Sequence, residues 1–79
     1  MLIHYFPIMK RNAFLISLGK KIAEIRRSRG LSQEEAAYRA DTSAKHLSDI
    51  ERGLQNVSIL TLKKIATALK VKTWELPPD

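Results

Sequence analysis

The stretch ADTSAKHLSDIERG, residues 40–53, predicts two helices with almost no chain between them. Asp41 tolerates the left-handed conformation better than most residues other than Gly and Asn, so a tight stop is predicted there. Ser43 then caps a new helix in which Leu47 and Ile50 face the core. Two short helices joined by so tight a turn must cross at a wide angle. The first therefore braces the second and leaves one face of the second projecting from the surface.

The helix before this turn has its own start signal. In SQEE, residues 32–35, the Ser32 side chain can accept from the Glu35 amide while the Glu35 carboxylate reaches back to the Ser32 amide, which is a capping box. The helix is predicted over residues 33–40. Its inward face consists of small residues, Ala36, Ala37 and Ala40. Close crossing needs a small residue where two backbones meet, so the pattern favours a helix-turn-helix over a generic helical bundle.

Hydrophobic periodicity predicts further helices and no sheet. Asn12 is a possible N-cap for a helix that Gly30 ends, with an apolar stripe at Phe14, Leu18, Ile22 and Ile25. Ser58 caps another helix, whose apolar residues at helical spacing are Ile59, Leu62, Ile65, Ala66 and Leu69. Thr73 opens a last short turn that Pro77 and Pro78 end. The predicted fold is all-α, with four helices and this last short turn over residues 12–79, and an N-terminal arm over residues 1–11.

Composition limits the classes of function. A chain of 79 residues is one domain near the lower end of what a lone apolar core can hold, so a partner subunit is one way to complete burial. The absence of cysteine excludes disulfide scaffolds, thiolate zinc sites and cysteine nucleophiles, and two histidines make a metal site unexpected. No Ser-His-Asp set, paired carboxylates or phosphate-cradling glycine loop is visible. We therefore predict neither an enzyme nor a cofactor.

The positive charge is concentrated near the start of the chain. The net charge is +6 and the pI is about 10. Residues 10–29 contain seven Lys and Arg residues against Glu24 alone, whereas from Gly30 onward seven basic residues balance seven acidic ones. The excess of positive charge therefore lies on the first predicted helix and on the residues just before it. This distribution suits attraction to a polyanion such as nucleic acid or to an anionic membrane.

The opening MLIHYFPIM, residues 1–9, is apolar but is interrupted by Pro7 and lacks a positive n-region and a small-residue cleavage site. A signal peptide or a membrane span is therefore not predicted, and we expect a cytoplasmic protein. Three interpretations of this arm stay open: disorder, an edge strand that packs on a partner, or an extension upstream of an internal start at Met9.

Residues 30–71, GLSQEEAAYRADTSAKHLSDIERGLQNVSILTLKKIATALKV, resemble the Cro and phage-repressor type, or XRE-type, helix-turn-helix family. The signatures are LSQEE, LSDIERG, NVS and LKKIATALKV. The resemblance implies a five-helix, lambda-repressor-like domain that binds palindromic operator DNA as a dimer. Similar proteins include phage repressors, antitoxins and controller proteins of restriction-modification systems. The sequence departs from the family pattern in having Asp41 and Lys70 where Gly is usual, and Val57 where Pro is usual.

The helix after the tight turn is narrow enough to enter the major groove, where base pairs are distinguishable. With Leu47 and Ile50 turned inward, Ala44, Lys45, Ser48 and Asp49 face outward, and the resemblance places base readers among them. Lys45 can donate to guanine, Ser48 to either kind of base edge, and Ala44 can pack on a thymine methyl. Asp49 could accept from cytosine, but pairing with Lys45 four residues earlier is favoured. His46, on the flank, is either a DNA contact or solvated.

Phosphate contacts are predicted on three segments. The amide and side chain of Gln33 can donate to phosphate at a helix N-terminus. The resemblance adds residues after the third helix, namely Arg52, Gln55 and Asn56. Some basic residues of the helix predicted between Asn12 and Gly30 should flank the groove. The alternative is that they form a solvated face. These residues are Lys20, Lys21, Arg26 and Arg27. Glu51 is predicted to make a structural pair or cap, because phosphate repels a carboxylate.

One such domain reads few base pairs, so specificity calls for two copies roughly 34 Å apart. The predicted dimer interface consists of apolar residues near the end of the chain, because a solvent-exposed monomer surface rarely groups such side chains. They are Val71, Trp74 and Leu76. Trp74 could instead cover the core. We therefore predict a homodimeric, sequence-specific double-stranded DNA-binding regulator associated with the nucleoid. A restriction-modification controller is favoured, since the chain stops soon after the domain. A prophage repressor, an antitoxin or a helical protein-binding module are the alternatives.

Overall fold

The computed structural model describes residues 12–72, which form four helices and no strand. They are α2 (Ala13–Ser28), α3 (Gln33–Arg39), α4 (Ala44–Glu51) and α5 (Ile59–Leu69). The all-helical prediction holds for these residues. The short turn expected from Thr73 and the arm over residues 1–11 lie outside the described residues, so the count of five helices is not established.

The helices start where the capping signals predict. Each of α2 to α5 has a polar N-cap whose side-chain oxygen accepts from a backbone N–H of the first turn: Asn12, Ser32, Ser43 and Ser58. The capping box of α3 is complete, because the Glu35 amide donates to Ser32 Oγ at 3.0 Å and the Ser32 amide donates to Glu35 Oε1 at 2.9 Å. The backbone hydrogen bond from Ser32 holds the pKa of the Glu35 carboxyl below its ordinary value.

All four helices end in the same way. The residue after each C-terminal turn takes a positive φ, at Gly30 (71°), Asp41 (57°), Gly53 (73°) and Lys70 (62°). The next amide donates back to a carbonyl five residues earlier, as Thr42 does to Ala37 at 2.9 Å. This is the Schellman motif. The predicted tight stop at Asp41 is confirmed, and it leaves only residues 40–43 between α3 and α4.

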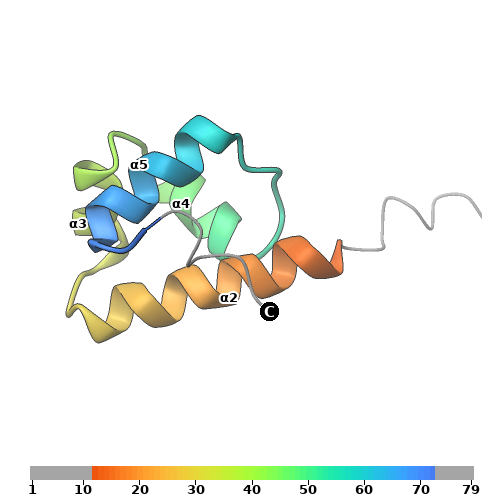
Figure 1. Ribbon diagram of the computed structural model, residues 1–79, viewed down its shortest axis with the longest axis horizontal. Helices are drawn as coiled ribbons and strands as arrows, with labels where there is room; N and C mark the ends of the chain where they lie inside the picture. Colours follow the sequence, from red (N-terminus) through yellow and green to blue (C-terminus); the bar gives the residue numbers. More distant parts are fainter. Residues whose placement is uncertain (1–11, 73–79) are drawn as a thin grey trace, which may run out of the picture.

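The core gathers where the helices cross. Its most buried large side chains are Ile22, Leu47, Ile50, Ile65 and Leu69, and the three inward alanines of α3 and its cap are buried with them. Two members of the predicted stripes are not in the core, since Phe14 is 53% exposed and Ile59 is 77% exposed. Both lie in the first turn of a helix, and Figure 1 shows the Phe14 end of α2 reaching beyond the other helices.

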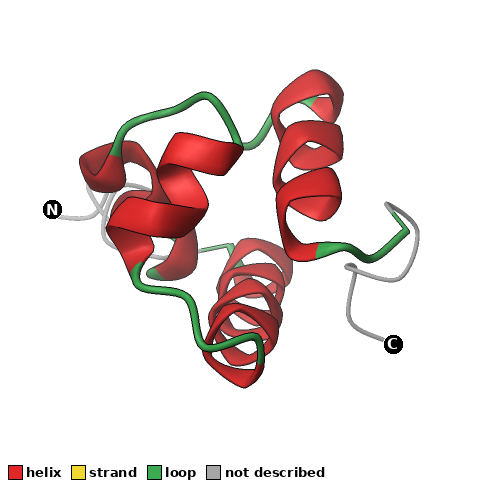
Figure 2. Ribbon diagram, turned by 90° about the vertical axis from the view of Figure 1, so that its left-hand side faces the viewer, coloured by secondary structure: helices red, strands yellow, loops and turns green. Residues whose placement is uncertain are grey.

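The packing of α2 and α3 against α4 leaves one side of α4 facing outward. α2 runs along one side of the molecule and packs against α4, while α3 packs against both α4 and α5 (Figure 1). Figure 2 shows the same arrangement seen end-on to α2, with α5 leading toward the C-terminus. α4 is therefore held from two sides by α2 and α3, and its remaining surface is available to solvent.

Candidate nucleic-acid interface

α4 has an inner and an outer face. Leu47 and Ile50 are each 1% exposed and anchor the inner face in the core. On the outer face the Lys45 side chain is 83% exposed, and Ser48 is half-buried. Ala44 is also half-buried, because part of its surface packs against the core. The geometric expectation that Leu47 and Ile50 point inward is thus confirmed.

His46 was predicted on the flank of this outer face. Its side chain is half-buried, and its backbone amide donates to Ser43 Oγ at 3.0 Å in the N-cap of α4. Its role as a DNA contact stays a prediction.

Asp49 is the centre of a polar cluster at the end of α4. Its carboxylate accepts from Arg52 Nη2 at 2.9 Å, and from Lys45 Nζ and Gln55 Nε2 at 3.3 Å each. These four residues, Asp49, Lys45, Arg52 and Gln55, are called the Asp49 cluster below. Asp49 is only 7% exposed although it belongs to the outer side of α4. The hydrogen bonds from Lys45 and Arg52 outweigh burial and hold the pKa of the Asp49 carboxyl below its ordinary value.

The Asp49 cluster both confirms and extends the sequence prediction. The pair between Lys45 and Asp49, expected from their spacing of four residues, is present. Direct base reading by Asp49 is disfavoured, because three donors already occupy its carboxylate. Arg52 and Gln55 were predicted as phosphate contacts, but their link to Asp49 was not predicted. The spacing of three residues between Asp49 and Arg52 was the signal available for one of these links.

A second polar network lies inside the domain. Arg26 is 8% exposed and donates to Glu51 through Nε at 2.7 Å and through Nη2 at 3.1 Å, and its Nη1 donates to the Leu31 carbonyl at 2.8 Å. The Gln33 side-chain amide donates to Glu51 Oε1 at 2.9 Å. The network joins α2, the start of α3 and the end of α4 around one buried carboxylate.

This network corrects one predicted phosphate contact. Arg26 was expected to flank the DNA groove, but its guanidinium is buried and donates three hydrogen bonds to Glu51 and to the Leu31 carbonyl. The reason is that the Arg26 side chain lies on the side of α2 that meets α4, where Glu51 is buried. The expected structural pair of Glu51 is confirmed, with Arg26 as its partner. Gln33 keeps its place at the start of α3, although Glu51 takes one of its side-chain donors.

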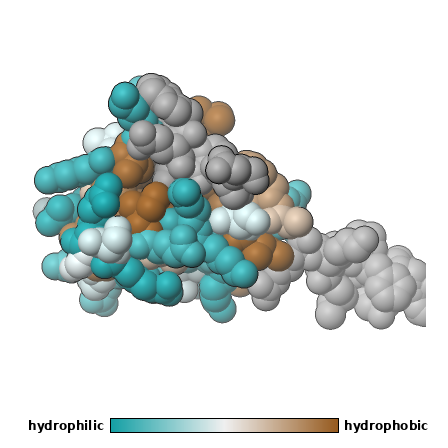
Figure 3. All heavy atoms as spheres, turned by 60° about the horizontal axis from the view of Figure 1, so that its bottom comes forward, coloured by the Kyte–Doolittle hydropathy of each residue, from teal (hydrophilic) through white to brown (hydrophobic). Residues whose placement is uncertain are grey.

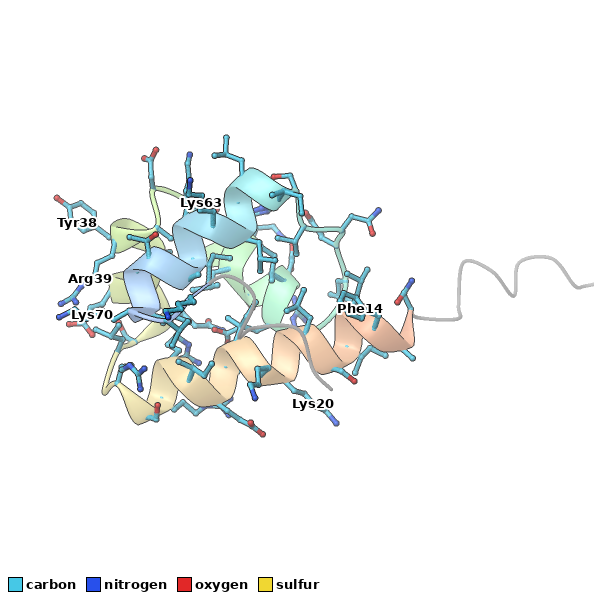
Figure 4. The ribbon with its side chains drawn as sticks, in the orientation of Figure 1. Phe14, Lys20, Tyr38, Arg39, Lys63 and Lys70 are labelled. Atoms are coloured by element: carbon cyan, nitrogen blue, oxygen red, sulfur yellow. The ribbon has the colours of Figure 1, made fainter. Side chains whose placement is uncertain are left out.

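An open cleft brings several predicted contacts together. Its volume is about 410 Å³, and α2, α3 and α4 all contribute to its walls. We call it the cationic cleft, lined by Lys20, Ala23, Glu24, Arg27, Gln33, Ser48, Glu51 and Arg52. The Lys20 side chain extends from α2 at the lower edge of the view in Figure 4. The side of α2 that is turned outward in Figure 3 is mostly hydrophilic, with smaller hydrophobic areas between the polar side chains.

The remaining predicted residues are dispersed. Lys21 is half-buried on α2 and does not line the cationic cleft, and Asn56 is exposed in the loop before α5. Val71, predicted at the dimer interface, is half-buried and packs against the core. Trp74 and Leu76 lie outside the described residues. Sequence reasoning did not anticipate the exposed apolar side chains Tyr38, Ile59 and Leu60.

Over residues 12–72, no three His, Cys, Asp or Glu side chains gather in a way that could hold a metal ion. None of the helices in the same range has the length and apolar character that crossing a bilayer requires.

Comparisons with known proteins agree with this geometry. A model of the family described as Helix-turn-helix matches residues 22–75. The chain is 42% identical over 59 residues to the HTH-type transcriptional regulator y4dJ of Sinorhizobium fredii, with 75% of this chain and 77% of the relative covered. It is 39% identical over 66 residues to the control protein C.BamHI of Bacillus amyloliquefaciens, with 82% of each chain covered.

A solved structure shares the arrangement of the helices. The restriction-modification controller protein C.AhdI from Aeromonas hydrophila superimposes with a TM-score of 0.81 and 37% sequence identity. The match covers 82% of this chain and 98% of the controller protein.

Proposed function

Because this chain belongs to the helix-turn-helix family of transcriptional regulators, we propose that it acts as a homodimer on a palindromic double-stranded DNA operator. The outer face of α4 is the observation that carries this proposal. Lys45 and Ser48 are presented there by a helix whose other side is fixed in the core by Leu47 and Ile50. A helix held in this way can enter the major groove without disturbing the fold.

The base readers follow from the exposure of each side chain. Lys45 reaches furthest and donates to guanine O6 or N7. Ser48 lies on the same side of α4 and at the edge of the cationic cleft, so it serves a base edge close to the DNA backbone. Ala44 offers its methyl group to thymine, and His46 adds a contact on the flank of α4.

The cationic cleft supplies the phosphate contacts in this proposal. Lys20, Arg27 and Arg52 bring three positive charges to a cleft that also holds the start of α3 at Gln33. Neutralised phosphates release counterions, and this release supplies most of the sequence-independent affinity. Lys21, Gln55 and Asn56 contribute at the edges. Arg26 is not part of the contact surface, because it is buried against Glu51.

Restriction-modification control is the proposed biological setting. Its support is the match to C.AhdI, which extends over 98% of that controller protein, and the match to the control protein C.BamHI. Occupation of a promoter operator by the homodimer would regulate the neighbouring genes, in the cytoplasm and on the nucleoid. Prophage repression and antitoxin activity share the same mode of DNA binding. The genes beside this one distinguish the three settings.

Lys45→Ala tests the role of the outer face of α4. Duplexes are first selected from random DNA by the wild-type protein, and affinities are then measured by fluorescence anisotropy across a salt series. We expect Lys45→Ala to weaken operator binding by about 1–3 kcal/mol and to relax the preference at one base position in each half-site, because a base-edge donor is lost.

Lys63→Ala is the matched control, because it removes the same charge from an exposed lysine that lies on α5 and not on α4 (Figure 4). An equal loss on all sequences for Lys45→Ala would show a phosphate contact instead of a base contact. The log of the affinity for duplex should fall steeply with the log of the salt concentration. No duplex binding even at low salt would overturn the proposed function and favour a module that binds only proteins.

A further inference from the structure

The Asp49 cluster places a buried carboxylate beneath the very side chains that the proposed function assigns to DNA. Lys45 is a base reader in that function, and Arg52 and Gln55 are phosphate contacts. All three donate to the same carboxylate, at distances of 2.9 to 3.3 Å. The Lys45 and Arg52 side chains are 83% and 60% exposed, whereas the Asp49 side chain is 11% exposed, so the shared acceptor is far more buried than the two cations that donate to it.

The negative charge of the Asp49 carboxylate repels the phosphate backbone of DNA. An ordinary duplex offers phosphates everywhere, and cations that are free to turn would bind any of them. Here Lys45 and Arg52 already have an acceptor, so DNA must provide a better one to displace it. A guanine edge at the right place does so for Lys45 because it accepts in a defined geometry, whereas a misplaced phosphate does not.

We propose that Asp49 is a specificity-determining positioning residue, which holds Lys45, Arg52 and Gln55 until a correctly placed operator takes over their donors. This inference rests on the proposed function, since it concerns how that function discriminates between sequences. Asp49 acts through its neighbours and touches no base itself. Its effect is to lower affinity for arbitrary DNA more than affinity for the operator.

Asp49→Asn tests the proposal because it keeps the shape of the side chain and removes its charge. Affinities of the full chain for the selected operator and for a scrambled duplex are measured across a salt series. We expect binding to the scrambled duplex to strengthen more than binding to the operator, so that the ratio of the two affinities falls about tenfold. On scrambled DNA, the slope of log affinity against log salt concentration should steepen by about one, because Lys45 then neutralises a further phosphate.

Glu24→Gln is the matched control. Glu24 is an exposed carboxylate in the cationic cleft, close to the same DNA but outside the Asp49 cluster. Its removal changes the net charge by the same amount, so it strengthens both affinities together and leaves their ratio as in the wild type. A second variant, Asp49→Ser, guards against a fold defect of the first, and circular dichroism checks that each variant is helical at the temperature of the binding measurement.

A double-mutant cycle separates positioning from mere packing. If Asp49 acts through Lys45, the effect of Asp49→Asn on the affinity ratio shrinks in a Lys45→Ala background. A purely structural role predicts a lower melting temperature with an unchanged ratio, and that result overturns the inference while the proposed function stands. Loss of preference at a single cytosine position also overturns it, because Asp49 would then read a base. Absence of duplex binding by the wild type overturns the proposed function instead.

Discussion

Gly19 shows how a single residue sets the distance between two helices. A Cβ atom at this position would overlap the Ile50 carbonyl oxygen and lie only 2.5 Å from that of Glu51. These are backbone atoms, so no side-chain rotation can relieve the contact. The lack of a side chain at Gly19 therefore lets α2 approach the end of α4 closely, where Ile50 enters the core and Glu51 meets Arg26.

We expect Gly19→Ala to destabilise the domain by about 3 kcal/mol, because the added methyl forces α2 away from α4 and this exceeds the gain in helix propensity. Thermal unfolding followed by circular dichroism measures the change. Ser17→Ala is the control, since Ser17 is exposed in the same helix and its loss should leave the melting temperature nearly unchanged. A Gly19→Ala protein as stable as the wild type would contradict the close approach.

At the scale of single residues the sequence predicted local partners better than distant ones. The Lys45–Asp49 pair follows from helical spacing, and it is present. The partner of Arg26 lies 25 residues away, and only the crossing of α2 and α4 brings the two side chains together. Arg26 therefore looked like one more basic residue on an exposed helix. Glu51 was predicted to be structural because phosphate repels its negative charge, but the sequence did not identify Arg26 as its partner.

The helices themselves were predictable because their boundaries depend on neighbours in sequence. An N-cap side chain bonds to amides two or three residues ahead, and a Schellman motif closes over six residues. The two stops without glycine differ in chemistry. Asp41 has a short polar side chain that tolerates the left-handed region, whereas Lys70, at the end of α5 (Figure 4), has no such advantage.

Lys70→Gly should raise the free energy of unfolding by about 0.5–1 kcal/mol, because relief of a strained left-handed residue exceeds the added entropy of the unfolded chain. Chemical denaturation measures this gain. Lys70→Ala removes the same charge and side chain but keeps a Cβ atom, so it should not stabilise α5. Equal gains for both substitutions would assign the effect to the lysine side chain and not to the backbone.

At the scale of the whole molecule, α3 connects the parts of the domain. It packs against both α4 and α5, and the hydrogen bonds around Glu51 link it to α2. The packing of α3 against α4 was predictable from the short turn and the alanines. The exposure of Ile59 and Leu60 was not, because periodicity places residues on a face without showing whether another helix covers that face.

Trp74→Ala tests the proposed homodimer. The sequence predicts Trp74 at the interface, and we expect its removal to shift the protein toward the monomer in analytical ultracentrifugation, since a large apolar contact is lost. Tyr38→Ala is the control, because Tyr38 is an aromatic residue of α3 that is 86% exposed. An unchanged mass together with a lower melting temperature would place Trp74 in the core of one subunit.

The buried pair of Arg26 and Glu51 also restricts how this protein can evolve. Loss of either partner alone leaves an uncompensated interior charge, which costs about 3–5 kcal/mol, a large share of the stability of a small domain. Single-step mutants at these two positions are therefore poorly folded intermediates. Descendants should keep both residues or exchange both together, while Lys45 and Ser48 on the outer face of α4 are free to vary and acquire new operators.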